Sequence, residues 1–176
     1  VELCARDLEG YEVGIYVGQK GPGVPGVAAA DEVGIAAELV SRSTGIPVRV
    51  ISQCSHEEML GWYGRARAYV GLSISDAIPT SLLEAMVTGA FPIQSNTGAA
   101  GEWVVDGESG IIVPPEDPGV VAAAIRRAVS DDALVDRAAE INARVARERL
   151  DENLIRPRVV AMYQRIAADG MHKGGT

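Results

Sequence analysis

Two carboxylates, Asp76 and Glu84, are separated by seven residues in the chemically most unusual stretch of this chain. Asp76 lies in a polar loop, and Glu84 lies in the first turn of the helix expected to follow. Both side chains can therefore face one crevice. A carboxylate can accept hydrogen bonds from two adjacent hydroxyls. The pair therefore suits a ligand with vicinal hydroxyls on two sugars, as in a nucleotide sugar.

The loop between the two acids also suits a phosphate. Residues Ser75 to Ser81 run into the amino end of a helix, which offers unpaired N–H groups and the positive end of the helix dipole. A second loop, Ser95 to Gly101, is rich in small residues that let backbone approach a ligand. No Lys or Arg occurs between Arg67 and Arg126. Backbone amides must therefore hold a diphosphate here, and cations must come from outside this stretch.

The elements expected to position these loops are short strands and helices in alternation. Five apolar runs without strict alternation are typical of strands buried on both faces of a parallel sheet. The runs are Val13 to Val17, Val48 to Ser52, Tyr69 to Ser73, Phe91 to Ser95 and Gly110 to Val113. Helical spacing lies between them, weakly at Ala36 to Ser43 and clearly at Val120 to Val129. The sequence therefore predicts a doubly wound, mostly parallel, Rossmann-like α/β sheet with helices on both faces.

The ends of the elements carry further signals. Ser55 with Glu58, and Ser81 with Glu84, fit capping boxes, and Asp117 fits a helix cap. Residues 18–31, rich in Gly and Pro, are expected to form a mobile loop. A helical extension is expected from Ala133 onward, interrupted at Pro157, with a last helix over 159–168 and a frayed tail over 170–176.

Composition excludes several classes of function. The chain has 176 residues, 16 of them basic and 24 acidic, which predicts one domain that binds neither nucleic acid nor anionic lipid. The longest uncharged stretch, Ala85 to Gly101, is too polar for a membrane span. Cys4 and Cys54 fit neither a metal site nor a disulfide framework, so a reducing, cytoplasmic setting is expected. Because the chain begins with Val, we expect further residues upstream.

The stretch Ser75 to Pro114 resembles the donor-binding, carboxyl-terminal domain of retaining glycosyltransferases of family 4, which have the GT-B fold. The family's pattern of an acid, seven residues and a Glu stands here as Asp76 and Glu84. The matching segments are Ser75-Asp76-Ala77-Ile78-Pro79, Leu83-Glu84-Ala85-Met86, Gly89, Pro92-Ile93, Gly98, Gly101-Glu102, Val105-Asp106-Gly107, Gly110 and Ile112-Val113. The resemblance implies the donor-binding half of a hexosyltransferase, which would be inactive alone and would need an amino-terminal acceptor domain.

The resemblance also implies a role for each matching residue. Glu84 would contact the ribose, and Asp76 would lie near the donor sugar and the reacting centre. The backbone between them would support the sugar and the diphosphate, and the strand-to-helix corner before residue 55 would lie near the base. The implied donor-binding residues are Ala77, Ile78, Pro79, Thr80, Ser81, Leu82, Ser52, Gln53, Cys54 and Gly98. The substrate would be a nucleoside-diphosphate sugar, and no metal or other cofactor is expected.

The sequence departs from the family at two positions and leaves alternatives open. The first acid is Asp rather than Glu, and Ala77 replaces the usual Gly. The family's Arg and Lys pair would precede Val1. Glu84 can instead complete a capping box, Asp76 can be a turn residue, and His56 can be a solvated helix end. The competing functions are a non-catalytic binding or scaffolding module and a sugar-nucleotide epimerase of the same fold.

Overall fold

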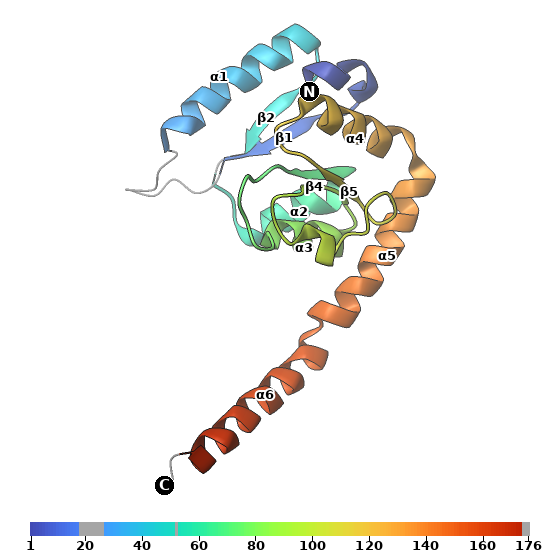
Figure 1. Ribbon diagram of the computed structural model, residues 1–176. Coiled ribbons are helices and arrows are strands. Elements are labelled where there is room, and N and C mark those ends of the chain that lie inside the picture. The colour runs from blue at the N-terminus through green and yellow to red at the C-terminus, as the bar shows by residue number, and fades with distance from the viewer. Residues whose placement is uncertain (18–26, 52, 174–176) are drawn as a thin grey trace.

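The computed structural model describes residues 1–17, 27–51 and 53–173. Strands and helices alternate along most of this length (Figure 1). The strands are β1 (Val13–Tyr16), β2 (Val48–Ile51), β3 (Ala68–Gly71), β4 (Phe91–Ser95) and β5 (Ile111–Val113). The helices are η1 (Glu2–Leu8), α1 (Val27–Thr44), α2 (His56–Arg65), α3 (Thr80–Thr88), η2 (Ala100–Glu102), α4 (Pro118–Ser130), α5 (Asp132–Leu150) and α6 (Glu152–Lys173). The five predicted strands are confirmed, with small shifts of their ends.

All strand pairs in the described residues are parallel, and they form two separate groups. β1 pairs with β2, and β4 lies between β3 and β5. Helices α1 and α4 lie on one side of the strands, and α2 and α3 lie on the other (Figure 1). Strand β4 is buried at every position, as expected for a central strand covered on both faces. The predicted doubly wound α/β fold is therefore confirmed.

The core beneath the candidate site lies between α3 and the segment after β4. Leu82 and Met86 of α3 are almost fully buried and pack with Ala100 and Val104. A second cluster joins β4 and β5 to α4 and α5 on the opposite face. The first turn of α3 is therefore anchored in the interior, and the loop that leads into it has a fixed end.

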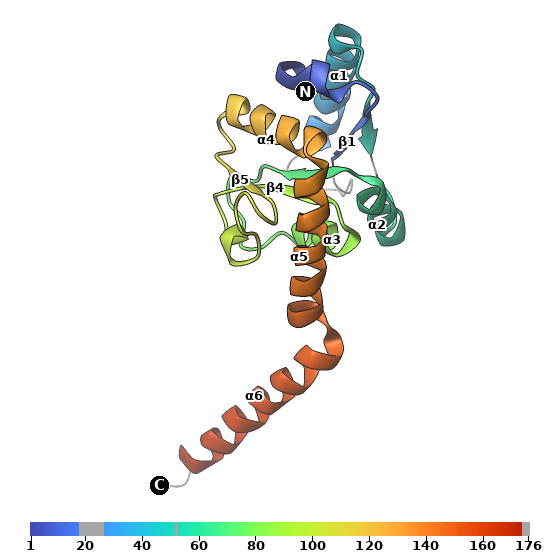
Figure 2. The same ribbon diagram turned by 90° about the vertical axis from the view of Figure 1, so that its right-hand side faces the viewer.

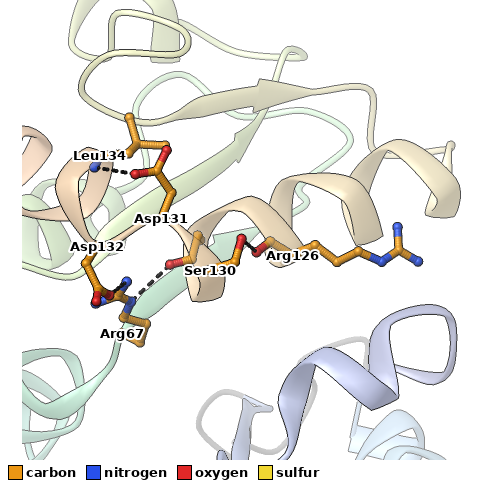
Figure 3. A network of polar contacts seen from close by, with 7 residues as sticks. Arg67, Arg126, Ser130, Asp131, Asp132 and Leu134 are labelled. Carbon is orange, nitrogen blue, oxygen red and sulfur yellow. Dashed lines mark hydrogen bonds and ion pairs between the residues drawn. The ribbon is translucent and has the colours of Figure 1, made fainter.

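The junction of α4 and α5 is held to the start of β3 by polar contacts (Figure 3). Arg67, just before β3, donates from Nε to the carbonyl oxygen of Ala128 at 3.0 Å and pairs with Asp132. Asp131 caps α5 by accepting from the N–H of Leu134 at 2.9 Å. These contacts fix the helical extension against the sheet.

The ends of several elements differ from the sequence-based expectations. Helix α1 begins at Val27, so the loop expected over 18–31 is too long, and residues 18–26 lie outside the described residues. Pro157 lies inside α6 without interrupting it, and the chain breaks instead at Asp151. The carbonyl oxygen that loses its partner belongs to Asn153, an exposed residue that water can reach.

Part of the tail expected over 170–176 is helical, because α6 continues to Lys173. Residues 174–176 lie outside the described part of the chain. Helix α6 extends away from the body of the domain in both views (Figures 1 and 2). The predicted caps at Ser55 and Asp117 are present: Ser55 and Glu58 form a capping box, and Asp117 accepts from two N–H groups of α4.

Truncation of Leu82 tests whether the core anchors the candidate loop. We expect Leu82→Ala to lower the free energy of unfolding by about 2–5 kcal/mol, because the side chain is fully buried and its removal leaves a cavity. Val87→Ala on the exposed side of the same helix should change it by no more than about 0.5 kcal/mol. Denaturant titration measures both, and equal effects would contradict this account of the core.

Candidate functional site

The candidate site is the corner between β3 and α3. Residues Ser75 to Ala77 are exposed, and Pro79 stands at the N-cap of α3 with an extended backbone and no side-chain cap. The N–H groups of Leu82 and Leu83 both donate to the carbonyl oxygen of Pro79. No hydrogen bond between described residues uses the N–H groups of residues 77, 78, 80 and 81. The corner therefore presents backbone donors that water or an anion can take.

The second Gly-rich loop explains why two of these donors, the N–H groups of Ala77 and Ile78, face outward. The N–H of Ala99 donates to the carbonyl oxygen of Ala77 at 2.8 Å. A Cβ atom on Gly98 would lie 2.5 Å from the carbonyl oxygen of Asp76 and 2.9 Å from that of Ala77. These two carbonyl groups therefore point at the second loop. Because the peptides are trans, the N–H groups of Ala77 and Ile78 point the opposite way.

The expected capping box of Ser81 and Glu84 is not formed, and that prediction is wrong. Helix α3 begins at Thr80, so Ser81 lies inside the first turn rather than at its cap. The hydroxyl of Ser81 instead shares a 2.8 Å hydrogen bond with the phenol of Tyr69. The Glu84 carboxylate has no capping partner to bind and contacts His56 of α2, with 2.8 Å between Oε1 and Nε2.

Two tyrosines lie behind the corner. The rings of Tyr63 and Tyr69 meet edge to face, with centroids 5.8 Å apart. Burial raises the pKa of Tyr63 to about 12, and the neighbouring Tyr69 and Glu84 add to this shift. Burial also raises the pKa of Tyr69. Both phenols therefore stay neutral at physiological pH and remain able to donate hydrogen bonds.

The structure brings the two sequence-predicted carboxylates to the same tyrosine. Besides burial, the charges of Asp76 and Glu84 both raise the pKa of Tyr69, while its hydrogen bond to Ser81 lowers it. Asp76 is exposed, whereas the Glu84 side chain is 22% exposed. Both carboxylates therefore lie near enough to Tyr69 for their charges to act on its phenol.

Residues 52–54, which the sequence places near the base, belong to the neighbouring corner between β2 and α2. Gln53 is exposed and Cys54 is half-buried on the path from β2 into α2, and Ser52 lies outside the described residues. The contact between His56 and Glu84 places this path beside α3. The role of His56 is missed by sequence reasoning, because nothing in the local pattern links it to a residue 28 positions away.

Residues Ser75 to Ala77 of the corner are exposed to solvent. Two cavities of about 450 Å³ each lie elsewhere, one between η1, Leu72 and α4, and one around residues 9–12 and 45–47. Among the described side chains, no three His, Cys, Asp or Glu gather as a metal site would require. The chemistry that the corner itself offers is anion binding by backbone and hydroxyl binding by carboxylates.

Open parallel α/β sheets bind nucleotides and similar ligands at the carboxyl ends of their strands. The corner lies at such an end, after β3, which is the place where α/β proteins of this architecture bind their ligands. A family model described as "Glycosyl transferases group 1" matches residues 37–145. The chain belongs to this glycosyltransferase family.

Curated relatives match the chain over part of its length. Glycogen synthase of Mycobacterium tuberculosis is 36% identical over 102 residues, covering 58% of this chain and 24% of that protein. A D-inositol 3-phosphate glycosyltransferase of Nocardioides sp. is 34% identical over 96 residues, covering 54% of this chain and 21% of that protein. The chain thus spans about a quarter of the length of the curated relatives it matches.

Solved structures share the fold at lower identity. Sucrose-phosphate synthase of Thermosynechococcus elongatus superposes with a TM-score of 0.78 at 21% identity, over 96% of this chain and 42% of that one. Anabaena HepE in complex with UDP-glucose superposes with a TM-score of 0.70 at 15% identity, over 93% of this chain and 44% of that one. In this chain, none of the described helices combines the length and the apolar character of a membrane span.

Substitution of Gly98 tests the contact between the two loops. We expect Gly98→Ala to lower the free energy of unfolding by about 1–3 kcal/mol, because the added Cβ would overlap backbone oxygens that cannot move freely. Gly64→Ala in α2 is a matched control with open space around the new Cβ, and should stabilise the protein by up to about 1 kcal/mol. Thermal and denaturant unfolding measure both. A neutral Gly98→Ala would mean that the loops are not in contact.

Proposed function

We propose that this chain is the nucleotide-sugar-binding half of a retaining hexosyltransferase. The observation that carries the proposal is the group of outward-facing N–H groups at the start of α3, with Asp76 and Glu84 on either side. Family membership supports transfer of a sugar, and HepE, which has the same fold, was solved with UDP-glucose bound. In the proposal the substrate is a nucleoside-diphosphate sugar.

The proposed reaction joins the anomeric carbon of the donor sugar to an acceptor hydroxyl, and the nucleoside diphosphate leaves. Backbone N–H groups of residues 77, 78, 80 and 81 stabilise the negative charge that develops on the leaving diphosphate. Glu84 accepts hydrogen bonds from the ribose hydroxyls, and Asp76 accepts them from the sugar being transferred. Leu82 contributes differently, because its N–H is already bound to Pro79 and its side chain anchors the loop in the core.

The proposal also includes a part of the site contributed from beyond this stretch of chain. In the proposal, a further strand lies between the two groups of strands, next to β1 of one group and β3 of the other, as the order of a doubly wound sheet supports. Tyr16 and Val70 of these edges are 46% and 41% exposed, although strands of this kind are usually covered. A strand at this place would end beside the corner and could deliver the cations that residues 68–125 do not supply. An acceptor domain would complete the enzyme.

Nucleotide titration tests the binding half of the proposal. We expect UDP, GDP or ADP to bind this chain with a millimolar dissociation constant, and Glu84→Ala to weaken binding roughly tenfold, because the carboxylate loses its charge-assisted hydrogen bonds to the ribose. Glu148→Ala on the exposed face of α5 is the matched control and should bind as the wild type does. Calorimetry or NMR titration measures both. Absence of binding to a folded sample at millimolar nucleotide would contradict the proposal.

Activity of the full-length protein tests the role of Asp76. We expect Asp76→Ala to lower kcat on the order of a hundredfold, because the donor sugar loses a hydrogen-bond acceptor that holds it in place. Asp76→Glu, which restores the family's usual residue, should retain activity. Equal activity of all three proteins would remove Asp76 from the mechanism.

A non-catalytic binding module is the second candidate, favoured by the Asp at position 76 and by Ala77 in place of the usual Gly. It predicts that the full-length wild type binds nucleotide and transfers no sugar.

A further inference from the structure

A hydrogen bond between two helices holds the Glu84 carboxylate at the edge of the candidate site. His56 is the first residue of α2, and its Nε2 lies 2.8 Å from Oε1 of Glu84 in α3. The histidine side chain is 70% exposed, whereas the glutamate side chain is 22% exposed. The imidazole therefore reaches from the surface to a partly buried carboxylate.

The contact between His56 and Glu84 contributes little to the stability of the fold. An ion pair with one partner so exposed contributes little to folding, because water screens the charges and both side chains lose freedom. Glu58 of the same helix is engaged elsewhere, since it accepts a hydrogen bond from the N–H of Ser55 at 2.7 Å. Between described residues, the acid that His56 contacts is Glu84, the one that the proposed function assigns to the ribose.

The geometry leaves the carboxylate ready to accept a second bond. His56 occupies Oε1, and no hydrogen bond between described residues uses Oε2 of Glu84. A carboxylate has about four acceptor positions, so Oε2 and the remaining lone pair of Oε1 stay open. Nε2–H donates to Glu84 both in one neutral tautomer of the imidazole and in its protonated form. The orientation therefore does not depend on the charge of His56.

We propose that His56 is a positioning residue of the nucleotide site, holding the Glu84 carboxylate in the orientation that receives the two hydroxyls of the ribose. The inference rests on the proposed function. It makes selectivity for ribose over deoxyribose a property of the pair rather than of Glu84 alone. A freely rotating Glu84 would spend part of its time turned away from the ligand, so the hydroxyl that distinguishes the two sugars would be bound less well.

The test compares a ribonucleoside diphosphate with its 2′-deoxy counterpart, using UDP and 2′-deoxy-UDP, and the corresponding GDP and ADP pairs. NMR titration suits the millimolar dissociation constants expected of this chain. We expect the wild type to prefer the ribonucleotide roughly tenfold, as for one hydrogen bond to a charged group. His56→Ala should reduce that preference to about threefold or less, because it weakens the ribonucleotide, which offers two hydroxyls to Glu84, more than the deoxynucleotide, which offers one.

Two variants separate positioning from a general structural effect. His56→Gln keeps an N–H donor near the same place and should retain most of the ribose preference. Glu57→Ala, at the next and also exposed position of α2, should behave as the wild type does. A merely structural role of His56 would weaken both nucleotides equally and leave their ratio unchanged, which would overturn the inference.

The failure of this inference can be told apart from failure of the proposed function. If Glu84→Ala abolishes the ribose preference and His56→Ala retains it, Glu84 binds ribose unaided and only the role of His56 is wrong. If the wild type shows no preference, or binds none of the nucleotides, then Glu84 does not contact ribose, and both the site assignment and the inference fail.

Discussion

The contact between two backbones at Gly98 determines what the corner before α3 can do. Because the carbonyl oxygens of Asp76 and Ala77 face the second loop, the N–H groups of the same peptides face outward. Any side chain at position 98 would push the loops apart. Glycine is thus needed at position 98 because the backbone of the first loop lies against it, and it acts on the site by orienting that backbone.

The buried end of α3 completes this arrangement. Leu82 sits in the core one turn into the helix, and its N–H closes onto Pro79. The loop is therefore held at both ends, by the core on one side and by residues 98–99 on the other. A rigid loop of this kind does not have to be ordered when a ligand arrives, so less binding free energy is lost to entropy.

Periodic and local patterns predicted most of the fold. Buried parallel strands such as β4 read as continuous apolar runs, and the cap at Ser55 is encoded within four residues. The sequence patterns failed to predict local structure where that structure depends on solvent or on residues far away in the chain. Pro157 fits within α6 because water can reach the carbonyl oxygen that it leaves unpaired. The start of α3 one residue before Ser81 removed a capping box that the local sequence fitted well.

At the candidate site, the local sequence predicts the position of each acid in the chain, because the loop and the first helical turn are local structure. The charges of Asp76 and Glu84 both act on the phenol of Tyr69. The partners of these acids are not local. His56 and Tyr69 arrive from other elements, and only the packing of α2 and β3 against α3 brings them to Glu84 and Ser81.

The lack of basic side chains from residue 68 to residue 125 has a consequence for how ionic strength acts on this corner. Fixed amide dipoles attract an anion only at short range, so dissolved ions weaken that attraction little. The formal net charge of −8, by contrast, repels an anion from a distance, and dissolved ions do weaken that repulsion. Added salt should therefore favour a polyphosphate here, which is the reverse of the behaviour of sites built from lysine and arginine.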